Sequence, residues 1–268
     1  MLVGVAHSDV VGNIAVVDAK KYLWQINLSH IKEIIPLQKI LIIKVMPNKL
    51  MDPIGKLMGL RYKSHPWHGV EIGSKAPEVV TCYIEMVPTD TVKYEVDKES
   101  GYLRIDRPQK YSNVVPALYG FIPQTYSSKK VAEFCNEKTG RTDIIGDNDP
   151  VDICVLTEKE IAHGDILVRA RPIGGFRMID SNEADDKIVA VLNNDAFYSS
   201  FNDITELPEL VIDRLKHYFL TYKDLPGKQI DVEISHVYGR EEAYEIINRS
   251  VEDYHNKFQN LESFLRDV

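Results

Sequence analysis

Short segments rich in β-branched and aromatic residues predict a series of strands from residue 79 onward. Val79–Val87 is the first, and it ends at Pro88. Further strands are predicted at Thr91–Asp97, Tyr102–Arg107, Asp152–Leu156, Asp165–Ala170, Gly175–Ile179 and Lys187–Leu192. The segment 98–101 is typical of a hairpin turn with Gly101 in a left-handed conformation. Many short strands bounded by Gly and Pro indicate a small barrel or sandwich.

Two longer segments carry apolar residues at helical spacing. The first begins near Pro208, a residue that suits the first turn of a helix. The second runs from about Glu241 to Arg266, and its apolar stripe comprises Ala243, Ile246, Ile247, Val251, Tyr254, Phe258, Leu261 and Phe264. A polar stretch between Tyr126 and Gly146 predicts either an exposed loop or a short inserted helix.

Residues 1–62 carry no pattern that assigns an element, so we treat them as an N-terminal extension and residues 63–268 as the main domain. Two interpretations stay open. The extension forms extra strands or a helix packed on the core, or translation starts further along the chain, at Met51 or Met58.

Composition narrows the function classes. The chain has 268 residues and a net charge of −8, which disfavours nucleic-acid binding because that affinity comes largely from Lys and Arg. The apolar run 34–46 is too short to span a bilayer and contains two lysines, so we predict no membrane segment. The three cysteines lie far apart without a CxxC motif, which fits a reducing compartment such as the cytoplasm.

The strongest chemical signal is the run Asp147-Asn148-Asp149-Pro150-Val151-Asp152. Two unit charges about 4 Å apart repel by roughly 4 kcal/mol at an effective dielectric constant of about 20. A fold gathers such groups only with a cation or strong hydrogen bonds, and hard oxygen ligands select magnesium, manganese or calcium. Taken alone, the run also fits a solvated acidic turn.

Weaker signals surround this run. Strand alternation places Asp185 and Lys187 on one face of their segment, and likewise Lys93 and Glu95. Arg107 follows the predicted hairpin, and further candidates are Asp180 and the pair Tyr222-Lys223. Each of these is also compatible with an ordinary solvated position or surface ion pair.

Together the segments resemble the soluble family I inorganic pyrophosphatases, whose signature D-x-D-P-x-D stands here at 147–152. The order and spacing also match at Ile84-Glu85, Lys93-Tyr94-Glu95, Asp106-Arg107, Pro116, Tyr119–Thr125, Arg171–Gly174, Asp185–Ile188, His217–Phe219 and Tyr222-Lys223. The resemblance implies a mainly β fold with α-helices, a five-stranded OB-like barrel with flanking helices. It implies a hydrolase that splits pyrophosphate into two phosphates by attack of a metal-activated water.

The same resemblance implies the cofactor and the assembly. Several Mg²⁺ ions per site are expected, with Mn²⁺ as a possible substitute. The protein is expected to form a homo-oligomer, a dimer or a hexamer, and to act in the cytoplasm on pyrophosphate, with no nucleic-acid or membrane partner.

The resemblance also assigns roles to individual residues. Asp147, Asp152 and Asp185 would hold the activating magnesium, Asp152 would bridge to a second ion, and Asp180 with Asp185 would hold an ion that arrives with the substrate. Asp149 would be the catalytic base. The phosphates would be bound by Lys93, Arg107, Tyr119, Lys187, Tyr222 and Lys223, with Glu85 and Glu95 in an outer shell.

Three positions depart from the family pattern. Ser181 replaces a second acid after Asp180, with Glu183 as a candidate substitute, and Val115 and Leu118 replace a tyrosine and an asparagine. We therefore predict a raised magnesium requirement. The alternative function is a non-catalytic metal- and phosphate-sensing protein on the same scaffold, and an oligonucleotide-binding barrel is disfavoured by the acidic charge.

Overall fold

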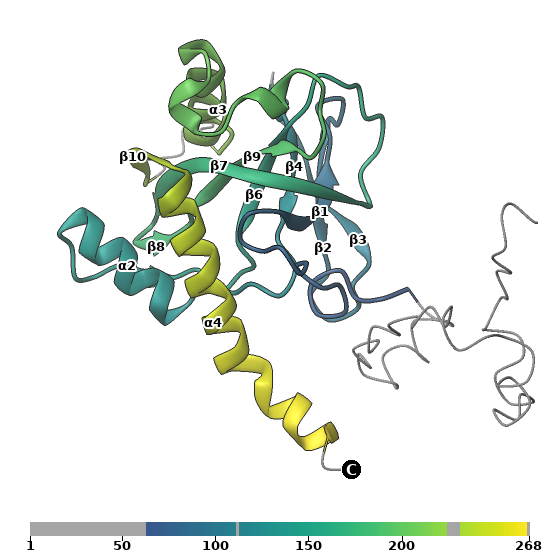
Figure 1. The fold of residues 1–268 in the computed structure, drawn as a ribbon, viewed down its shortest axis with the longest axis vertical. Helices are drawn as coiled ribbons and strands as arrows, with labels where there is room; N and C mark the ends of the chain where they lie inside the picture. The colour runs from purple at the N-terminus through teal and green to yellow at the C-terminus, as the bar shows by residue number, and fades with distance from the viewer. Residues whose placement is uncertain (1–62, 111–112, 224–230, 267–268) are drawn as a thin grey trace, which may run out of the picture. The chain divides into compact units, whose positions relative to one another are not determined.

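The computed structural model describes residues 63–110, 113–223 and 231–266, with side chains as far as residue 258 (Figure 1). The interpretations given for residues 1–62 lie outside this part of the chain. Among the described residues, the longest helices are too polar to cross a bilayer.

Five strands form a closed ring. Strands β1 (Val80–Met86), β4 (Leu118–Phe121), β6 (Asp152–Leu156), β9 (Lys187–Leu192) and β7 (Ile166–Asp180) pair in that order, and β1 also pairs with β7. Only the β6–β9 pairing within the ring is parallel. The predicted five-stranded closed sheet with flanking helices is therefore confirmed.

The strand β7 corrects one prediction. Asp165–Ala170 and Gly175–Ile179 were expected as separate strands, but one strand of 15 residues spans both. Its pairing with β9 shifts between Pro172 and Gly174, and this irregularity lets a long strand bend within a small ring. A Cβ atom at Gly174 would lie 2.5 Å from both Ile204 and the Tyr238 carbonyl oxygen, so the packing requires glycine there.

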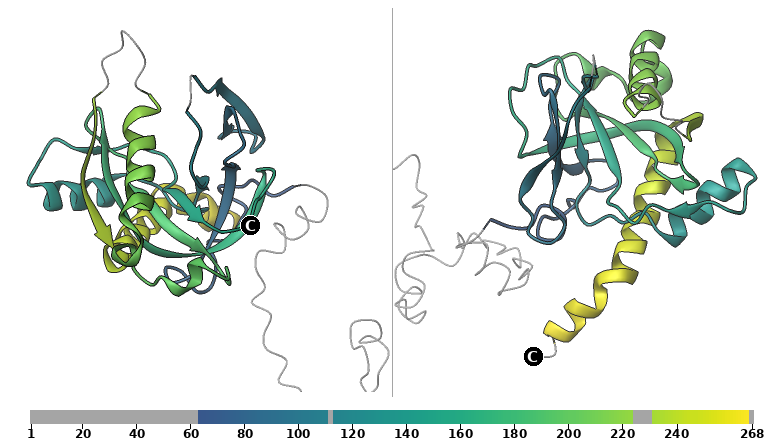
Figure 2. Two further views of the ribbon diagram at one scale, coloured as in Figure 1. Left: turned by 90° about the horizontal axis from the view of Figure 1, so that it is seen from above. Right: turned by 180° about the vertical axis from the view of Figure 1, so that it is seen from behind.

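A hairpin stands beside the ring (Figure 2). Strands β2 (Val92–Val96) and β3 (Leu103–Pro108) form it as predicted, and Gly101 has a φ of 73°. The strand β10 (Val232–Gly239), which extends the sheet along β7, was not predicted, nor was β4. Both escape a pattern search because β4 has four residues and β10 is only partly buried. Two-residue strands β5 (Ile145–Gly146) and β8 (Glu183–Ala184) pair with each other.

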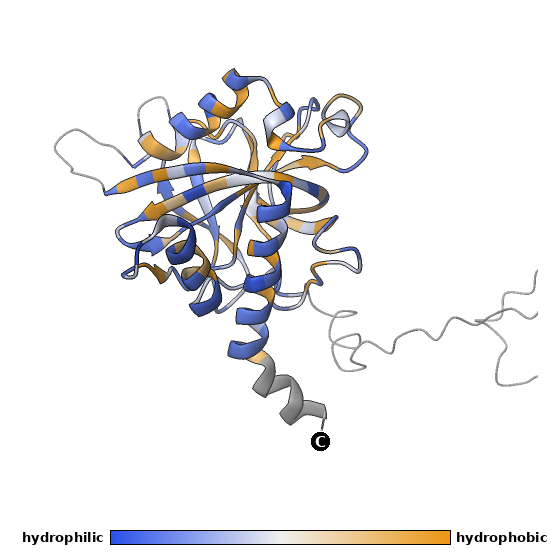
Figure 3. Ribbon diagram, turned by 60° about the vertical axis from the view of Figure 1, so that its left-hand side comes forward, coloured by the Kyte–Doolittle hydropathy of each residue, from blue (hydrophilic) through white to orange (hydrophobic). Residues whose placement is uncertain are grey.

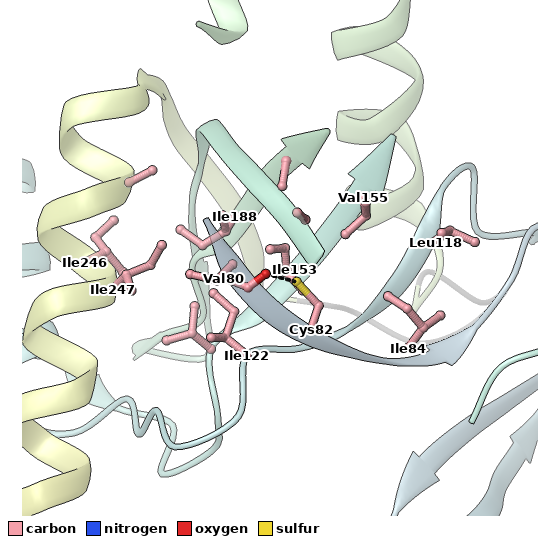
Figure 4. Packing of buried hydrophobic residues seen from close by; sticks show 14 of the residues in the cluster. Val80, Cys82, Ile84, Leu118, Ile122, Ile153, Val155, Ile188, Ile246 and Ile247 are labelled. Carbon is pink, nitrogen blue, oxygen red and sulfur yellow. Dashed lines mark hydrogen bonds between the residues drawn. The ribbon is translucent and has the colours of Figure 1, made fainter. Parts of the chain in front are cut away.

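Three α-helices of the described residues flank the sheet. The helix α3 (Glu209–Thr221) begins just after Pro208, and α4 (Arg240–Arg266) matches its predicted span within one residue. The stretch for which a loop or a helix was expected forms α2 (Lys129–Thr139). Polar and apolar positions alternate along α4 (Figure 3), and its Ile246 and Ile247 pack into the cluster that contains Val80 and Ile188 (Figure 4).

The start of α2 is capped by a residue from another helix. Ser128 provides no side-chain cap. Instead the carboxylate of Asp253 in α4, 5% exposed, accepts backbone N–H bonds from Ser128, Lys130 and Val131 at 2.9–3.2 Å. Because a negative charge at a helix N-terminus is stabilising, Asp253 fastens α2 to α4.

Removal of this cap has an expected cost. We predict that Asp253→Ala lowers the free energy of unfolding by about 1–3 kcal/mol, because it leaves one buried and two partly buried N–H groups without their acceptor. Urea unfolding measures the change. The matched control is Glu252→Ala, which removes only the exposed ion pair with Lys130 and is expected to change stability far less, because solvent screens an exposed pair. Equal losses in the two variants would contradict the capping role.

Candidate active site

A cavity of about 200 Å³ opens between the ring, the hairpin and the end of α3. Every predicted site residue except Arg107 lines it. The lining comprises Trp67, Glu85, Lys93, Glu95, Val96, Lys98, Tyr119, Phe121, Asp147, Asp149, Pro150, Asp152, Asp180, Glu183, Asp185, Lys187, Tyr222 and Lys223. Side chains from distant parts of the sequence therefore meet in one place.

The aspartate run folds as a turn. Asn148 has a φ of 63°, and the Asp149 amide donates to Oδ1 of Asp147 at 3.0 Å. The hydroxyl of Tyr126 donates to the Asn148 side-chain oxygen at 2.7 Å. The run is thus not extended, yet both aspartates line the cavity, and Asp152 joins them at the start of β6.

Lys187 lies at the centre of the acidic groups. Its ammonium group is 2% exposed and contacts the carboxylates of Asp152 and Asp185, the latter at 2.5 Å. Burial acts to lower its pKa, but the two carboxylates outweigh burial and hold the pKa well above its usual value. The prediction that Asp185 and Lys187 share a face is confirmed. The phenol of Tyr119 donates to Oδ2 of Asp152 at 2.5 Å.

Two other carboxyl groups of the site have raised pKa values. Burial, together with the charges of Asp185, Asp149 and Asp152, raises the pKa of Asp147 well above its usual range. Burial raises the pKa of Glu85 to about 8, against the opposing hydrogen bond from the Val96 amide at 2.7 Å. Such shifts mean that added positive charge would be favourable here.

Comparison with known proteins identifies the family to which this chain belongs. Residues 82–255 match the family model described as inorganic pyrophosphatase. The chain belongs to the inorganic pyrophosphatase family. The inorganic pyrophosphatase of Chlamydia caviae is 50% identical over 199 residues, which cover 72% of this chain and 92% of that protein. The soluble inorganic pyrophosphatase of Zea mays is 38% identical, covering 63% of this chain and 71% of that one.

A solved structure agrees with these sequences. The inorganic pyrophosphatase from Thermus thermophilus superimposes with a TM-score of 0.60 at 29% identity, covering 71% of this chain and 98% of that one. As an inorganic pyrophosphatase, the chain is a hydrolase, which confirms the enzyme class expected from the motifs.

The charge of the side chains that line this pyrophosphatase cavity favours the binding of cations. Eight carboxylates and four lysines line it, which leaves an excess of negative charge. Among the described residues, no three Asp, Glu, His or Cys side chains stand in metal-binding geometry. Ammonium groups lie against the carboxylates instead, at Lys187, at Lys223 beside Asp180 and at Lys98 beside Asp149. Oxygen-rich and acidic, the donor set suits Mg²⁺ or Mn²⁺.

Two features of the hairpin bear on the predicted site. Arg107 does not line the cavity. Its guanidinium pairs with Asp106, a residue that also lies 3.5 Å from Lys93. Lys93 in turn lies 3.8 Å from Glu95, so the prediction that these two share a face is confirmed.

Sequence reasoning missed Lys98 and Trp67 as residues of this pyrophosphatase cavity. Lys98 was assigned only to the hairpin turn, but its ammonium group contacts Asp149. Trp67 donates from Nε1 to the Thr125 carbonyl oxygen at 2.8 Å and forms part of the wall. No local pattern points to either residue. The position of Lys98 depends on how the hairpin packs, and that of Trp67 depends on how the segment before β1 packs.

Proposed function

We propose that this pyrophosphatase catalyses the Mg²⁺-dependent hydrolysis of pyrophosphate to two phosphates, with Mn²⁺ as a possible substitute. One observation carries the proposal, namely the convergence of the aspartate run with Asp180, Asp185 and several lysines on one small cavity. Carboxylates suit the cations and ammonium groups suit the phosphates, so the cavity contains both halves of what phosphoryl transfer needs.

The metal ligands are proposed from the acids that face the cavity. Asp147, Asp152 and Asp185 would hold the activating ion, with Asp152 bridging to a second one, and Asp180 with Asp185 would hold an ion that enters with the substrate. When bound, Mg²⁺ would lower the pKa of the attacking water and neutralise charge on the phosphates. The raised pKa of Asp147 fits this role, because burial and the neighbouring carboxylates disfavour its charged form and an added cation would stabilise it.

Asp149 is proposed as the catalytic base. It lines the cavity beside Asp147, and its side chain is 41% exposed, so water reaches it. It would accept the proton from the attacking water, and the backbone turn at Asn148 holds it in place. Its contact with Lys98 has to open for this step.

Cationic and phenolic groups are proposed to bind the phosphates. These are Lys93, Arg107, Tyr119, Lys187, Tyr222 and Lys223, and all but Arg107 line the cavity. The guanidinium of Arg107 would have to leave Asp106 to reach a phosphate. Glu85 and Glu95 would act from an outer shell. The lysines now paired with aspartates would exchange those carboxylates for phosphate oxygens.

Ser181 gives a prediction about the metal requirement. The Ser181 hydroxyl donates to Oδ1 of Asp180 at 3.1 Å. At position 181 the family pattern often has a second acid. Restoring that acid as Ser181→Asp is expected to lower the Mg²⁺ concentration for half-maximal activity severalfold, because affinity for hard cations rises with ligand charge. The φ of 54° at this position is one that Asp tolerates.

The measurement is a Mg²⁺ titration of initial rates for both proteins. Glu183 also lines the cavity and is the candidate that partly replaces the missing acid. Wild-type activity that already saturates at micromolar Mg²⁺ would contradict the predicted weak requirement, as would an unchanged titration in the Ser181→Asp variant.

The remaining expectations concern the oligomeric state and the cellular location. We expect a homo-oligomer, which sedimentation velocity measures, and action in the cytoplasm without a nucleic-acid or membrane partner. The non-catalytic sensor stays as the second candidate, and binding of pyrophosphate without phosphate release would favour it. Phosphate release in the presence and absence of a chelator tests the proposed function.

A further inference from the structure

A buried ion pair lies behind the proposed site. Arg177 in β7 is 0% exposed and Asp186 is 5% exposed. Nε of Arg177 donates to Oδ1 of Asp186 at 3.3 Å. Asp186 stands between Asp185 and Lys187, whose side chains contact each other at the cavity. The side chain of Asp186 is directed away from the cavity, into the layer between the sheet and the helices, where Arg177 meets it.

The Arg177 guanidinium connects this layer. It lies over the ring of Phe134 in α2 at 5.0 Å and over that of Tyr238 in β10 at 5.4 Å. Its Nη2 atom is 3.1 Å from a carboxylate oxygen of Glu242 in α4. One side chain thus links two helices and β10 to the residue that separates Asp185 from Lys187.

Stability alone does not account for such a pair. Desolvation of two buried charges often costs as much as their attraction returns, and apolar replacements of similar volume are frequently neutral or stabilising. Here the hydrogen bonding is also incomplete, because Nη1 of Arg177 is buried without a partner among the described residues. The location of the pair, directly behind two residues of the site, suggests a role in geometry.

We propose that Arg177 and Asp186 are positioning residues that hold Asp185 and Lys187 toward the cavity and so set the affinity for the activating cation. A rotation of the chain at residue 186 would turn both neighbours, since alternate side chains of an extended segment share a face. Backbone bonds fix the face, as the Asp185 amide donates to the Met178 carbonyl oxygen at 3.0 Å and Lys187 is paired with both β6 and β7, but they do not fix the rotamers of the side chains. The proposal rests on the proposed function of the cavity.

The test replaces both charges together. In the double variant Arg177→Met/Asp186→Val the buried pair is removed as a whole, and Glu242, which loses its contact with Arg177, keeps Lys138 at 3.5 Å and is 20% exposed. The melting temperature in excess chelator is therefore expected to stay close to that of the wild type. Mg²⁺ affinity, measured by calorimetric titration of the full chain without substrate, is expected to fall about 10–100-fold, the usual effect of removing groups that orient metal ligands. The Mg²⁺ concentration for half-maximal activity is expected to rise in parallel.

The control is Arg249→Met. Arg249 stacks on the same Phe134 ring at 4.6 Å and pairs with Glu245 at 2.6 Å, but no described contact joins it to residues 185–187. Its Mg²⁺ affinity is expected to match the wild type. A double variant that melts normally and binds Mg²⁺ with wild-type affinity would overturn the proposal.

Two further comparisons distinguish a failure of this proposal from a misfolded variant and from a failure of the proposed function. If the double variant does not fold, Arg177→Lys takes its place, because it keeps a cation near Asp186 but loses the fork that also reaches Glu242. A reduced Mg²⁺ affinity in this variant supports positioning, and an unchanged one overturns it. If the wild type binds Mg²⁺ but releases no phosphate, the proposed function fails, while the calorimetric comparison still decides on the ion pair.

Discussion

Asp149→Asn is expected to lower the turnover number for pyrophosphate by about 10²–10⁴-fold, the usual effect of removing a general base. The amide keeps the size of the carboxylate but cannot accept the proton. The side chain of Asp149 is 41% exposed and its backbone carbonyl accepts from the Ser127 amide, an interaction that the substitution leaves intact. The fold should therefore be retained.

Steady-state kinetics at saturating Mg²⁺ measures the effect, with circular dichroism as the test of folding. Asp213→Asn is the control, because Asp213 is an exposed aspartate of α3 outside the cavity lining, and its turnover is expected to be unchanged. If the turnover of Asp149→Asn is within a few-fold of the wild-type value, another group must be the base.

Lys187→Met is expected to make the stability of the protein depend more strongly on Mg²⁺ than that of the wild type does. The ammonium group is 2% exposed and contacts Asp152 and Asp185, so its removal leaves two partly buried carboxylates without their cation. Breaking a buried pair from one side typically costs about 3–5 kcal/mol. We expect a loss of that order in excess chelator, together with a large loss of activity because one of the proposed phosphate-binding cations is missing.

Millimolar Mg²⁺ should restore much of this stability, because a cation bound at the same carboxylates replaces the lost charge and stabilises the folded state by mass action. Thermal unfolding with Mg²⁺ and with chelator measures the difference. Lys130→Met is the control, because Lys130 pairs with exposed Glu252 and neither residue lines the cavity. A Lys187→Met protein that is destabilised equally with and without Mg²⁺ would argue against metal binding at these aspartates.

The sequence predicted much of the fold because the relevant signals are local. The hairpin follows from alternation and from Gly101, and the span of α4 follows from apolar residues at helical spacing. The long strand β7 was divided in two because Pro172 and Gly174 look like strand breakers, whereas here they form an irregularity that bends one strand. The strand β10 was missed although half-buried and exposed positions alternate along it, and its pairing with β7 places it in the sheet.

The candidate site was predicted in the same uneven way. Motif order brought together the aspartates and most of the groups proposed to bind phosphate, and these residues line one cavity. Lys98 was missed because its contact with Asp149 joins residues 51 apart in sequence. The ion pair of Arg177 and Asp186, nine residues apart, was missed because the pairing of β7 with β9 brings the two side by side, and its further contacts come from α2 and α4.

The most direct test of the central claim is the release of phosphate from pyrophosphate by the purified full-length chain, measured with millimolar Mg²⁺ and with excess chelator. The acidic cavity with its lysines predicts rapid release that the chelator abolishes and that added Mg²⁺ restores. Absence of release in both conditions, from protein shown to be folded, would contradict the account and favour a sensor of metal and phosphate on this scaffold.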